Sequence, residues 1–429
     1  MHTLLVQFTD VQGVAKGKWV PLAQLAAVLQ VGAGFAGPSI RGTGLPRSGP
    51  RSEYYARGDA STAQVLPWQP GVARIVGDGF VDGRPFEACP RQVLKRQCAR
   101  LAERGWTLQT GIEPEFFLLR RDATGWRAAD DLDRLDKPSY DLRSLTRQQG
   151  FLHALRQALE GCGATVLQTD HEDAHGQYEL NFLHDEALAS ADRLMLFKLA
   201  GHALAEERGL VFSMMPKPFA DQPGSGMHFH VSLWQGRQGL FDPPAGSADG
   251  LSTLGRQFAA GVLAHAPALA ALAAPTVNSY KRLTVGESLS GTTWAPAYIA
   301  HGPNNRTALV RTMAGRFEWR LPDASANPYL ATAGLIAAGL DGIERGLDPG
   351  AGCTDDLFAL SLAEIRARGI ALLPQSLAEA ADALERDAVV SGTLGPVLSA
   401  ELLQLQRAEA LAYARHVSAW ELDCYAARF

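Results

Sequence analysis

Cysteine is scarce in this sequence, and its spacing excludes two common roles. The 429 residues include five cysteines, an odd number, and no two of them form a CxxC pair. We therefore predict neither a disulfide framework nor a thiolate-bound structural metal, and we expect a reducing, cytoplasmic environment. The five are Cys89, Cys98, Cys162, Cys353 and Cys424.

An excess of positive charge is also missing. Forty Lys and Arg residues stand against 45 Asp and Glu residues, a formal net charge of −5. This balance argues against general binding to nucleic acids or to anionic membranes. The first residues lack a basic stretch followed by an apolar one, so we expect no export signal. The most apolar segment, 258–277, is interrupted by His265, Pro267 and Pro275, and we interpret it as a buried helix.

The composition is typical of a globular protein, and the predicted strands and helices follow an α+β or α/β pattern. Hydrophobic residues make up 46% and charged residues 20%, and the length suits two or three domains. The start predicts two short strands around the turn 11–13, and the Gly-, Pro- and Ser-rich stretch 32–58 predicts a long functional loop. Pro90 begins a predicted helix that ends at Gly105. Strand-like and helical runs then alternate, and helices dominate from Asn327 onward.

Two carboxylates separated by one residue are the first indication of a metal site. Glu113 and Glu115 stand in GIEPEFFLL, an apolar run that predicts a buried strand. Residues i and i+2 of a strand point to the same face, about 7 Å apart, so both carboxylates face one space. Their repulsion of about 2 kcal/mol would become attraction around a bound cation. A solvated strand edge is the alternative interpretation.

Two further segments add acids and imidazoles to this set. Glu172 and Glu179 stand in HEDAHGQYELNF, where Gly176 allows a turn that brings both carboxylates to one site. His228 and His230 alternate in GSGMHFHVSLW and so share a strand face, although either histidine alone is more typical of a structural residue. Four carboxylates with one or two imidazoles suit Mg²⁺ or Mn²⁺ better than structural zinc.

Five arginines between residues 282 and 320 indicate an anion site in an acidic protein. Only two acids, Glu287 and Glu318, lie in the same stretch. Arginine forks bind carboxylate and phosphate oxygens, and divalent cations beside them are what phosphoryl transfer needs. The chain has no GxxxxGK[ST] motif, and its GxGxxG match, GAGFAG at 32–37, lies in the stretch predicted as a loop and not between a strand and a helix, so P-loop, Rossmann and protein-kinase interpretations lose support. A solvated basic face is the alternative. The arginines are Arg282, Arg306, Arg311, Arg316 and Arg320.

Taken together, these segments resemble the glutamine synthetase family along essentially the whole chain. The resembling stretches, in order, are FTDVQGVAKGKWVPL, GIEPEFFLL, HEDAHGQYELNF, MMPKPF with GSGMHFHVSL, PTVNSYKRL, NNRTALVR and RFEWRLPDASANPYL. Within that family the chain is most similar to the shorter type III (GlnT-like) group, which includes γ-glutamylmethylamide synthetases and other γ-glutamylamine ligases.

The resemblance implies an α+β fold and a ring assembly. It implies a small N-terminal β-grasp domain over 1–89 and a large catalytic domain over 90–429, built on a curved antiparallel sheet with helices. It further implies a homo-oligomer, a dodecamer of two stacked hexameric rings. In that assembly a neighbour's N-terminal domain completes each active site.

The resemblance also implies roles for individual residues. One divalent cation would be held by Glu115, Glu172 and Glu179, and a second by Glu113, His228 and Glu318. L-Glutamate and the transferring phosphoryl group would be bound by Arg282, Arg306, Arg320 and the loop residue Gly224. ATP would be lined by Arg311, Arg316, His230 and Ser232.

The implied reaction has two steps and needs a general base. The γ-carboxylate of glutamate attacks the γ-phosphate of ATP, and an amine then displaces phosphate from γ-glutamyl phosphate. The base implied by resemblance is Glu287, although it follows Arg282 one residue sooner than the family pattern has it. Ala36 stands where the family has an aspartate that helps bind ammonium, and Glu53 is a candidate to supply an acid there. We therefore expect small primary amines to be accepted at least as well as ammonia.

Three alternatives stay open at this point. The chain is an ordinary glutamine synthetase using ammonia if Glu53 or a residue of 32–58 restores the ammonium site. A non-catalytic ring-forming relative would have lost metal ligands, and none is missing from the sequence. A guanidino kinase on a related catalytic fold is disfavoured by the N-terminal domain and by the glutamate-site motifs.

Overall fold

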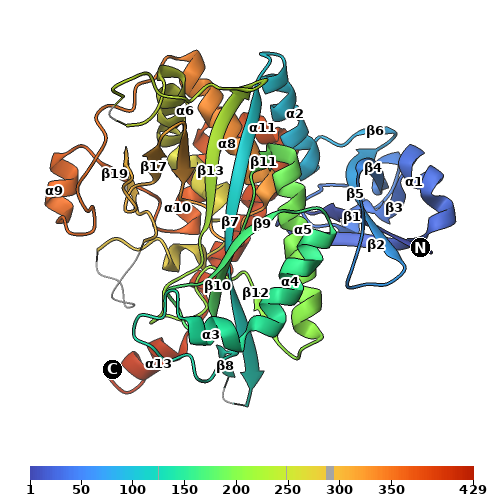
Figure 1. The fold of residues 1–429 in the computed structure, drawn as a ribbon, viewed down its shortest axis with the longest axis horizontal. Helices are drawn as coiled ribbons and strands as arrows, with labels where there is room; N and C mark the ends of the chain where they lie inside the picture. The colour runs from blue at the N-terminus through green and yellow to red at the C-terminus, as the bar shows by residue number, and fades with distance from the viewer. Residues whose placement is uncertain (124, 248, 287–293) are drawn as a thin grey trace.

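Two mixed β-sheets and a set of helices make up the molecule. The computed structural model describes residues 1–429 except 124, 248 and 287–293. A smaller sheet near the N-terminus lies to one side of a larger part that contains the second sheet and most of the helices (Figure 1). This is the predicted α+β class, with strands and helices segregated along much of the chain.

The N-terminal sheet has six strands. They are β1 (Thr3–Thr9), β2 (Ala15–Pro21), β3 (Ala33–Ala36), β4 (Glu53–Val65), β5 (Val72–Val81) and β6 (Arg84–Pro85). The order is β2-β1-β5-β4-β3, with β6 paired to β5 and only the β1–β5 pair parallel. The turn between β1 and β2 is the predicted one, with Gly13 at φ +79°. The helix α1 (Leu25–Gln30) contacts β4, and a 3₁₀ turn spans Leu22–Gln24.

The loop predicted for 32–58 is shorter than expected. Its two ends are the strand β3 and the start of β4, which pair with each other, and only 37–52 lacks strand structure apart from two 3₁₀ turns, Gly37–Ser39 and Pro50–Ser52. Ala33, Tyr54 and Ala56 are buried in the sheet. Pairing and burial across the sheet therefore override the local Gly- and Pro-rich composition.

The larger sheet has eleven strands in the order β16-β17-β18-β13-β7-β10-β9, with four short strands paired at its sides. The strands are β7 (Thr107–Asp122), β8 (Gly125–Ala128), β9 (Val166–His171), β10 (Gln177–Phe182), β11 (Asp185–Glu186), β12 (Val211–Ser213), β13 (Met227–Gln235), β14 (Gln238–Gly239), β16 (His301–Pro303), β17 (Val310–Met313) and β18 (Arg316–Trp319). All pairs are antiparallel except β16–β17. A separate two-stranded sheet joins β15 (Tyr298–Ile299) to β19 (Ala371–Leu372).

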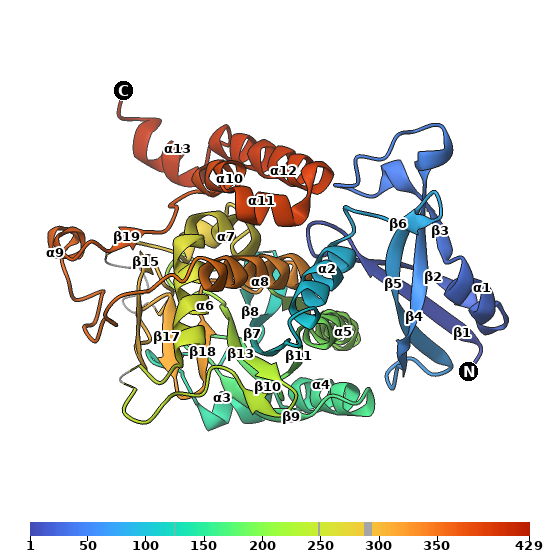
Figure 2. The same cartoon turned by 90° about the horizontal axis from the view of Figure 1, so that it is seen from above.

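Helices cover this sheet, and α8 is buried along most of its length. The helices are α2 (Pro90–Ala102), α3 (Leu142–Arg147), α4 (Gln149–Gly161), α5 (Ala187–Glu206), α6 (Thr253–Ala264), α7 (Ala266–Ala273), α8 (Pro328–Glu344), α9 (Leu362–Ala367), α10 (Leu377–Arg386), α11 (Ala388–Leu394), α12 (Pro396–Ala414) and α13 (Ala419–Tyr425), with a 3₁₀ turn at Ser279–Lys281. Figure 2 shows α10, α11 and α12 on one side of α8 and the large sheet on the other.

No single helix among the described residues is both long and apolar enough to cross a membrane. One bent pair, α11 with the stretch Pro396–Tyr425, meets the length and composition criteria jointly, at an angle of 105°.

A buried arginine joins the two parts of the molecule. Arg91, on α2, is 3% exposed, and its guanidinium contacts Asp78 Oδ1 at 2.6 Å and Asp59 Oδ2 at 3.0 Å in the N-terminal sheet. The same guanidinium contacts Asp192 Oδ2 on α5 at 2.8 Å. One cation thus ties the sheet, the helix after it and a core helix together. The predicted domain limits at 89 and 90 fall just before α2 and stay a prediction.

The apolar segment 258–277 contains two helices where we expected one. The helices α6 and α7 meet at His265, whose φ and ψ of −96° and 5° end the first helix. Pro267 stands in the first turn of α7, where its missing N–H costs nothing. His265 is 8% exposed, and its ring lies between two carboxylates, with Nδ1 2.6 Å from Asp387 Oδ2 and Nε2 3.0 Å from Asp341 Oδ2.

His265 is expected to make stability depend on pH. Burial lowers its pKa, but the bonds to Asp387 and Asp341 outweigh burial and raise it overall. A raised folded-state pKa means that this contribution is complete below about pH 6.5 and disappears as the pH rises through the folded pKa. His265→Gln should therefore cost about 2 kcal/mol near pH 6 and less near pH 9, measured by urea unfolding. The control is the exposed His153→Gln, and an equal loss at both pH values would contradict the charge pairing.

Candidate active site

Strands β7, β9, β10, β13, β17 and β18 of the large sheet contribute to the wall of a polar cavity of about 650 Å³. The carboxylates, imidazoles and arginines singled out from the sequence meet here from segments far apart along the chain. Those that line it are Glu113, Glu115, Glu172, Glu179, Gly224, His228, His230, Arg282, Arg306, Arg311, Arg316, Glu318 and Arg320.

Strand register explains how these side chains meet. The strand β7 lies between β10 and β13, with Glu115 opposite Glu179 on one side and Glu113 opposite His228 on the other. Because side chains alternate along a strand, Glu113 and Glu115 both face the cavity, as their spacing predicts. The same alternation places His228 and His230 on the cavity side of β13.

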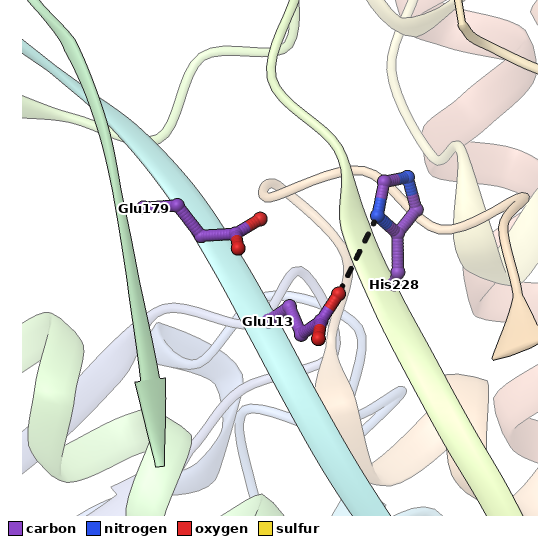
Figure 3. A group of neighbouring side chains, drawn as sticks. All are labelled: Glu113, Glu179 and His228. Carbon is purple, nitrogen blue, oxygen red and sulfur yellow. Dashed lines mark ion pairs between the residues drawn. The ribbon is translucent and has the colours of Figure 1, made fainter. Parts of the chain in front are cut away.

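Three of these residues form a group able to hold a metal ion. One ligand atom each of Glu113, Glu179 and His228 lies within 4.8 Å of the others. Figure 3 shows their side chains pointing toward one another from β7, β10 and β13, with His228 Nδ1 3.9 Å from Glu113 Oε2. Two carboxylates and one imidazole suit a divalent cation that prefers oxygen ligands. Glu179 belongs to the first predicted cation set, whereas Glu113 and His228 belong to the second.

Three buried carboxylates of this cavity have raised pKa values, because burial and mutual repulsion disfavour their charges. Burial, followed by the charges of neighbouring carboxylates, holds the pKa of Glu172 and of Glu179 well above the usual range. Burial also raises the pKa of Glu115 to about 7, although Arg282 and the N–H of Gly226 oppose the shift. A bound divalent cation would supply the missing charge and favour the ionised forms.

Glu115 is held by groups that sequence reasoning missed. Its Oε2 accepts hydrogen bonds from Gln177 Nε2 at 3.0 Å and from Gly226 N at 2.8 Å. A Cβ on Gly226 would lie 2.9 Å from Arg282 Nη2 and from His228 Nε2, so any other residue at this point would displace these side chains. Gln177 also donates to the carbonyl of Gly224 at 3.1 Å and thereby joins the acidic cluster to the Gly224 loop.

An arginine cluster borders the acidic group and centres on Glu318. Arg311 Nη1 donates to Glu318 Oε2 at 2.8 Å, and Arg320 Nη1 donates to Oε1 of the same residue. Burial raises the pKa of Glu318, but His228, Arg320 and other cations lower it to about 2. Its Oε1 lies 3.4 Å from His228 Nδ1. The predicted metal role of Glu318 stays a prediction, since its carboxylate bonds to arginines here.

The other arginines differ in how firmly they are held. Arg282 is 5% exposed and donates to the carbonyls of Leu321 at 3.1 Å and Arg320 at 3.3 Å, so its position is fixed by backbone. Arg306 and Arg316 are exposed at the mouth of the cavity.

His230 connects the exposed Arg316 to the acidic group. Arg316 Nε donates to His230 Nδ1 at 3.4 Å, and His230 Nε2 lies 2.9 Å from Glu113 Oε1. Because Nδ1 accepts, the proton of the neutral ring is on Nε2 and is donated to Glu113.

Two carboxylates that we did not single out from the sequence, Asp170 and Asp173, also line the cavity. Asp173 follows Glu172 directly, and its Oδ2 accepts a hydrogen bond from Trp294 Nε1 at 2.9 Å. Its Oδ1 accepts a bond from Ser139 Oγ, beside Tyr140 in the cavity wall. The only sign of Asp173 in the sequence was its place as the second acid of the HED triplet at 171–173. Its partners come from positions 139 and 294, a pairing that no local pattern predicts.

Three predicted residues lie elsewhere. Ser232 does not line the described cavity, and its Oγ accepts a hydrogen bond from Trp234 Nε1 at 2.9 Å. Glu53 and Ala36 pair with each other across β3 and β4, in the sheet that Figure 2 shows at the far side of the molecule from β17 and β18. Glu287 falls outside the described residues.

Comparison with known proteins identifies relatives of this chain. Residues 87–425 match the family model "Glutamine synthetase, catalytic domain". The chain belongs to the glutamine synthetase family. Its fold class and its resemblance to this family are therefore confirmed.

Individual relatives cover almost all of the chain. It is 50% identical over 423 residues to the glutamate–methylamine ligase of Methyloversatilis universalis, covering 98% of this chain and 95% of that protein. It is 40% identical to a glutamine synthetase of Rhizobium leguminosarum bv. phaseoli, with the same coverage. Among solved structures, a GmaS/ADP complex superposes with a TM-score of 0.92 at 38% identity, covering 99% and 97% of the two chains. A ligand-free GmaS gives a TM-score of 0.90 at 37% identity.

Proposed function

We propose that this chain is an ATP-dependent ligase that joins the γ-carboxylate of L-glutamate to a small primary amine and releases ADP and phosphate. The observation that carries the proposal is the carboxylate–imidazole group beside an arginine cluster in one cavity. The 50% identity to a glutamate–methylamine ligase supports the choice of an amine as the second substrate.

The donor set fits divalent cations. Glu113, Glu179 and His228 would hold one of them, and Glu115 with Glu172 would complete a second position in the same acidic wall. Mg²⁺ or Mn²⁺ bound there would neutralise the charge of the phosphate oxygens during transfer. Without such an ion, the buried carboxylates repel one another and their protonated forms are favoured.

The arginines bind and orient the anionic substrates. Arg282 and Arg320 are buried beside the acidic group, which suits them to fix a carboxylate or a transferring phosphoryl group at one position. Arg306 lies at the cavity wall and is assigned to the same substrates. Arg311, Arg316 and His230 are assigned to ATP. The close approach of the Gly224 loop to the Arg282 side chain suits a glutamate-binding loop.

The second step needs a base for the incoming ammonium group. The γ-glutamyl carbonyl is attacked by a neutral amine, so a carboxylate near that carbon must accept a proton. Asp173 is one candidate, held by Trp294 and Ser139 at the cavity wall. Glu287 is the other, and Glu53 of a neighbouring subunit would add an acid in the proposed homo-oligomer, a dodecamer of two hexameric rings.

The remaining parts of the proposal concern the setting of the enzyme. We propose a cytoplasmic protein whose partners are L-glutamate, ATP, an amine and other copies of itself, without nucleic acid or membrane. Ordinary glutamine synthesis from ammonia is the second candidate function, favoured by the 40% identity to a glutamine synthetase. A non-catalytic ring-forming role is disfavoured because the cavity keeps a complete donor group and its arginines.

An amine panel is expected to separate these candidates. Loss of the acidic ammonium contact at Ala36 weakens ammonia binding, whereas a methyl group in an apolar space contributes about 0.8 kcal/mol. We expect kcat/KM for methylamine and ethylamine to equal or exceed that for ammonium, measured by ADP release at fixed ATP and glutamate with product mass by mass spectrometry. A preference for ammonium above tenfold would reject the alkylamine assignment and favour glutamine synthetase.

A further inference from the structure

A second cavity, of about 690 Å³, lies outside the active site. It is enclosed by the faces of α5 and α12, by the β1–β2 turn and by the segment before Lys217. Its lining is mostly apolar. The side chains that form its walls include Met195, Leu199, Met214, Leu272, Leu330 and Leu402. A cavity of this volume is large enough for a small organic molecule.

Two polar side chains in this cavity have unused bonding capacity. Among the described residues, Lys198 Nζ donates a single hydrogen bond, a long one of 3.3 Å to the carbonyl of Ala326. Burial lowers the Lys198 pKa to about 8, and Asp323 offsets part of that effect. Gln406 is 3% exposed, and its Nε2 donates to Ala271 O at 2.6 Å. Its Oε1 is buried without a hydrogen-bond partner among the described residues.

An acid, Glu409, and an imidazole, that of His202, also line this cavity and limit which ligands fit. Glu409 uses Oε1 to accept a hydrogen bond from Val277 N at 2.9 Å, so it fixes the chain before the active-site arginine Arg282. Burial lowers the pKa of His202, which favours its neutral form. Lys198 is therefore the cation of this cavity, and an anionic group is its natural partner.

We propose that this cavity is a binding site for a small apolar carboxylic acid that also carries an N–H or O–H donor. The carboxylate would accept from Lys198, the donor would bond to Gln406 Oε1, and a branched alkyl group would lie against the methionine and leucine side chains. Such a ligand pairs both Lys198 and Gln406 Oε1, which an apolar ligand alone would not do.

The site shares a wall with the proposed active site. Met214, Met215 and Pro216 line the second cavity, and Lys217 lines the first. The Asn278 side chain holds Lys217 from both sides, accepting from its N at 2.7 Å and donating to its carbonyl at 3.0 Å. The carbonyl of Pro216 accepts a hydrogen bond from Ser225 N at 2.7 Å, beside the Gly224 loop. We therefore expect occupancy to change the KM for glutamate, an effect that rests on the proposed function.

Calorimetric titration of the full chain tests the site without turnover. The probe is 2-hydroxy-4-methylpentanoate, added to protein that is saturated with L-glutamate and a non-hydrolysable ATP analogue. We expect saturable one-site binding, at least tenfold weaker in Lys198→Met and unchanged within threefold in Lys198→Arg. The neutral amide of the same acid should bind at least tenfold more weakly than the acid. Thermal unfolding of each variant shows whether it is folded.

Specific results would overturn the proposal. Absence of probe binding, equal binding to the wild type and to a folded Lys198→Met, or equal binding of acid and amide would each do so. Binding that glutamate displaces would assign the probe to the active site instead. If saturating probe left the KM for glutamate unchanged, the coupling to the active site would be disproved, but the binding site itself would stand. Failure of the proposed ligase reaction would leave the calorimetric result intact, so the two can be distinguished.

Discussion

Glu179→Gln is expected to lower ATP- and glutamate-dependent ADP release about 10³-fold or more. The substitution keeps the shape of the side chain but removes the charge from the group formed with Glu113 and His228. A bound divalent cation contributes several kcal/mol to the stabilisation of transferring phosphate, and each 1.36 kcal/mol is tenfold in rate. The loss should appear in a coupled ADP assay at every Mn²⁺ concentration tested.

Stability distinguishes this loss from misfolding. Glu179 is 8% exposed, and burial, followed by the neighbouring carboxylates, raises its pKa, so its charge is unfavourable in the protein without metal. Removing the charge should leave the melting temperature unchanged or raise it. The matched control is Glu206→Gln on the exposed end of α5, which should keep full activity. Full activity of Glu179→Gln, or of wild-type enzyme in metal-stripped buffer, would disprove the metal site.

The acidic wall of the cavity was predictable because strands impose a simple rule. Alternation along β7 and β13 predicts that Glu113 and Glu115 share a face, and that His228 and His230 do as well. The rule needs only the sequence of one strand. It therefore works for residues whose positions depend on local backbone geometry. The resemblance to a known family then assigns roles that alternation alone does not.

The errors come from contacts between distant segments. Gln177 reaches Glu115 and Gly224 only after β10 pairs with β7. The strands β3 and β4 form within a stretch whose composition favours a loop, because each pairs with the other and buries apolar side chains. At the break between α6 and α7, His265 pairs with Asp341 on α8 and with Asp387, which lies between α10 and α11. None of these partners is visible in a local window.

Asp173→Asn is expected to separate the two steps of the proposed reaction. The amide oxygen and nitrogen retain the size of the side chain that Trp294 and Ser139 hold, but the group can no longer accept a proton from an alkylammonium ion. General-base catalysis is worth about 10² to 10⁴ in rate. Formation of γ-glutamylmethylamide should therefore fall about 10²-fold, whereas ADP release without amine should stay within about threefold of wild type.

Comparing variants of the two candidate bases, Asp173 and Glu287, shows which of them accepts the proton. Methylamide is quantified by mass spectrometry and ADP by a coupled assay, in wild type, Asp173→Asn, Glu287→Gln and the exposed control Asp136→Asn. If Asp173 accepts the proton, only the Asp173→Asn variant loses amide formation with every amine, and it retains slow ADP release. Raising the pH then restores part of its rate of amide formation, because more of the amine is neutral. Full amide formation by Asp173→Asn together with a loss in Glu287→Gln would assign the base to Glu287 and leave Asp173 as the residue that orients Trp294.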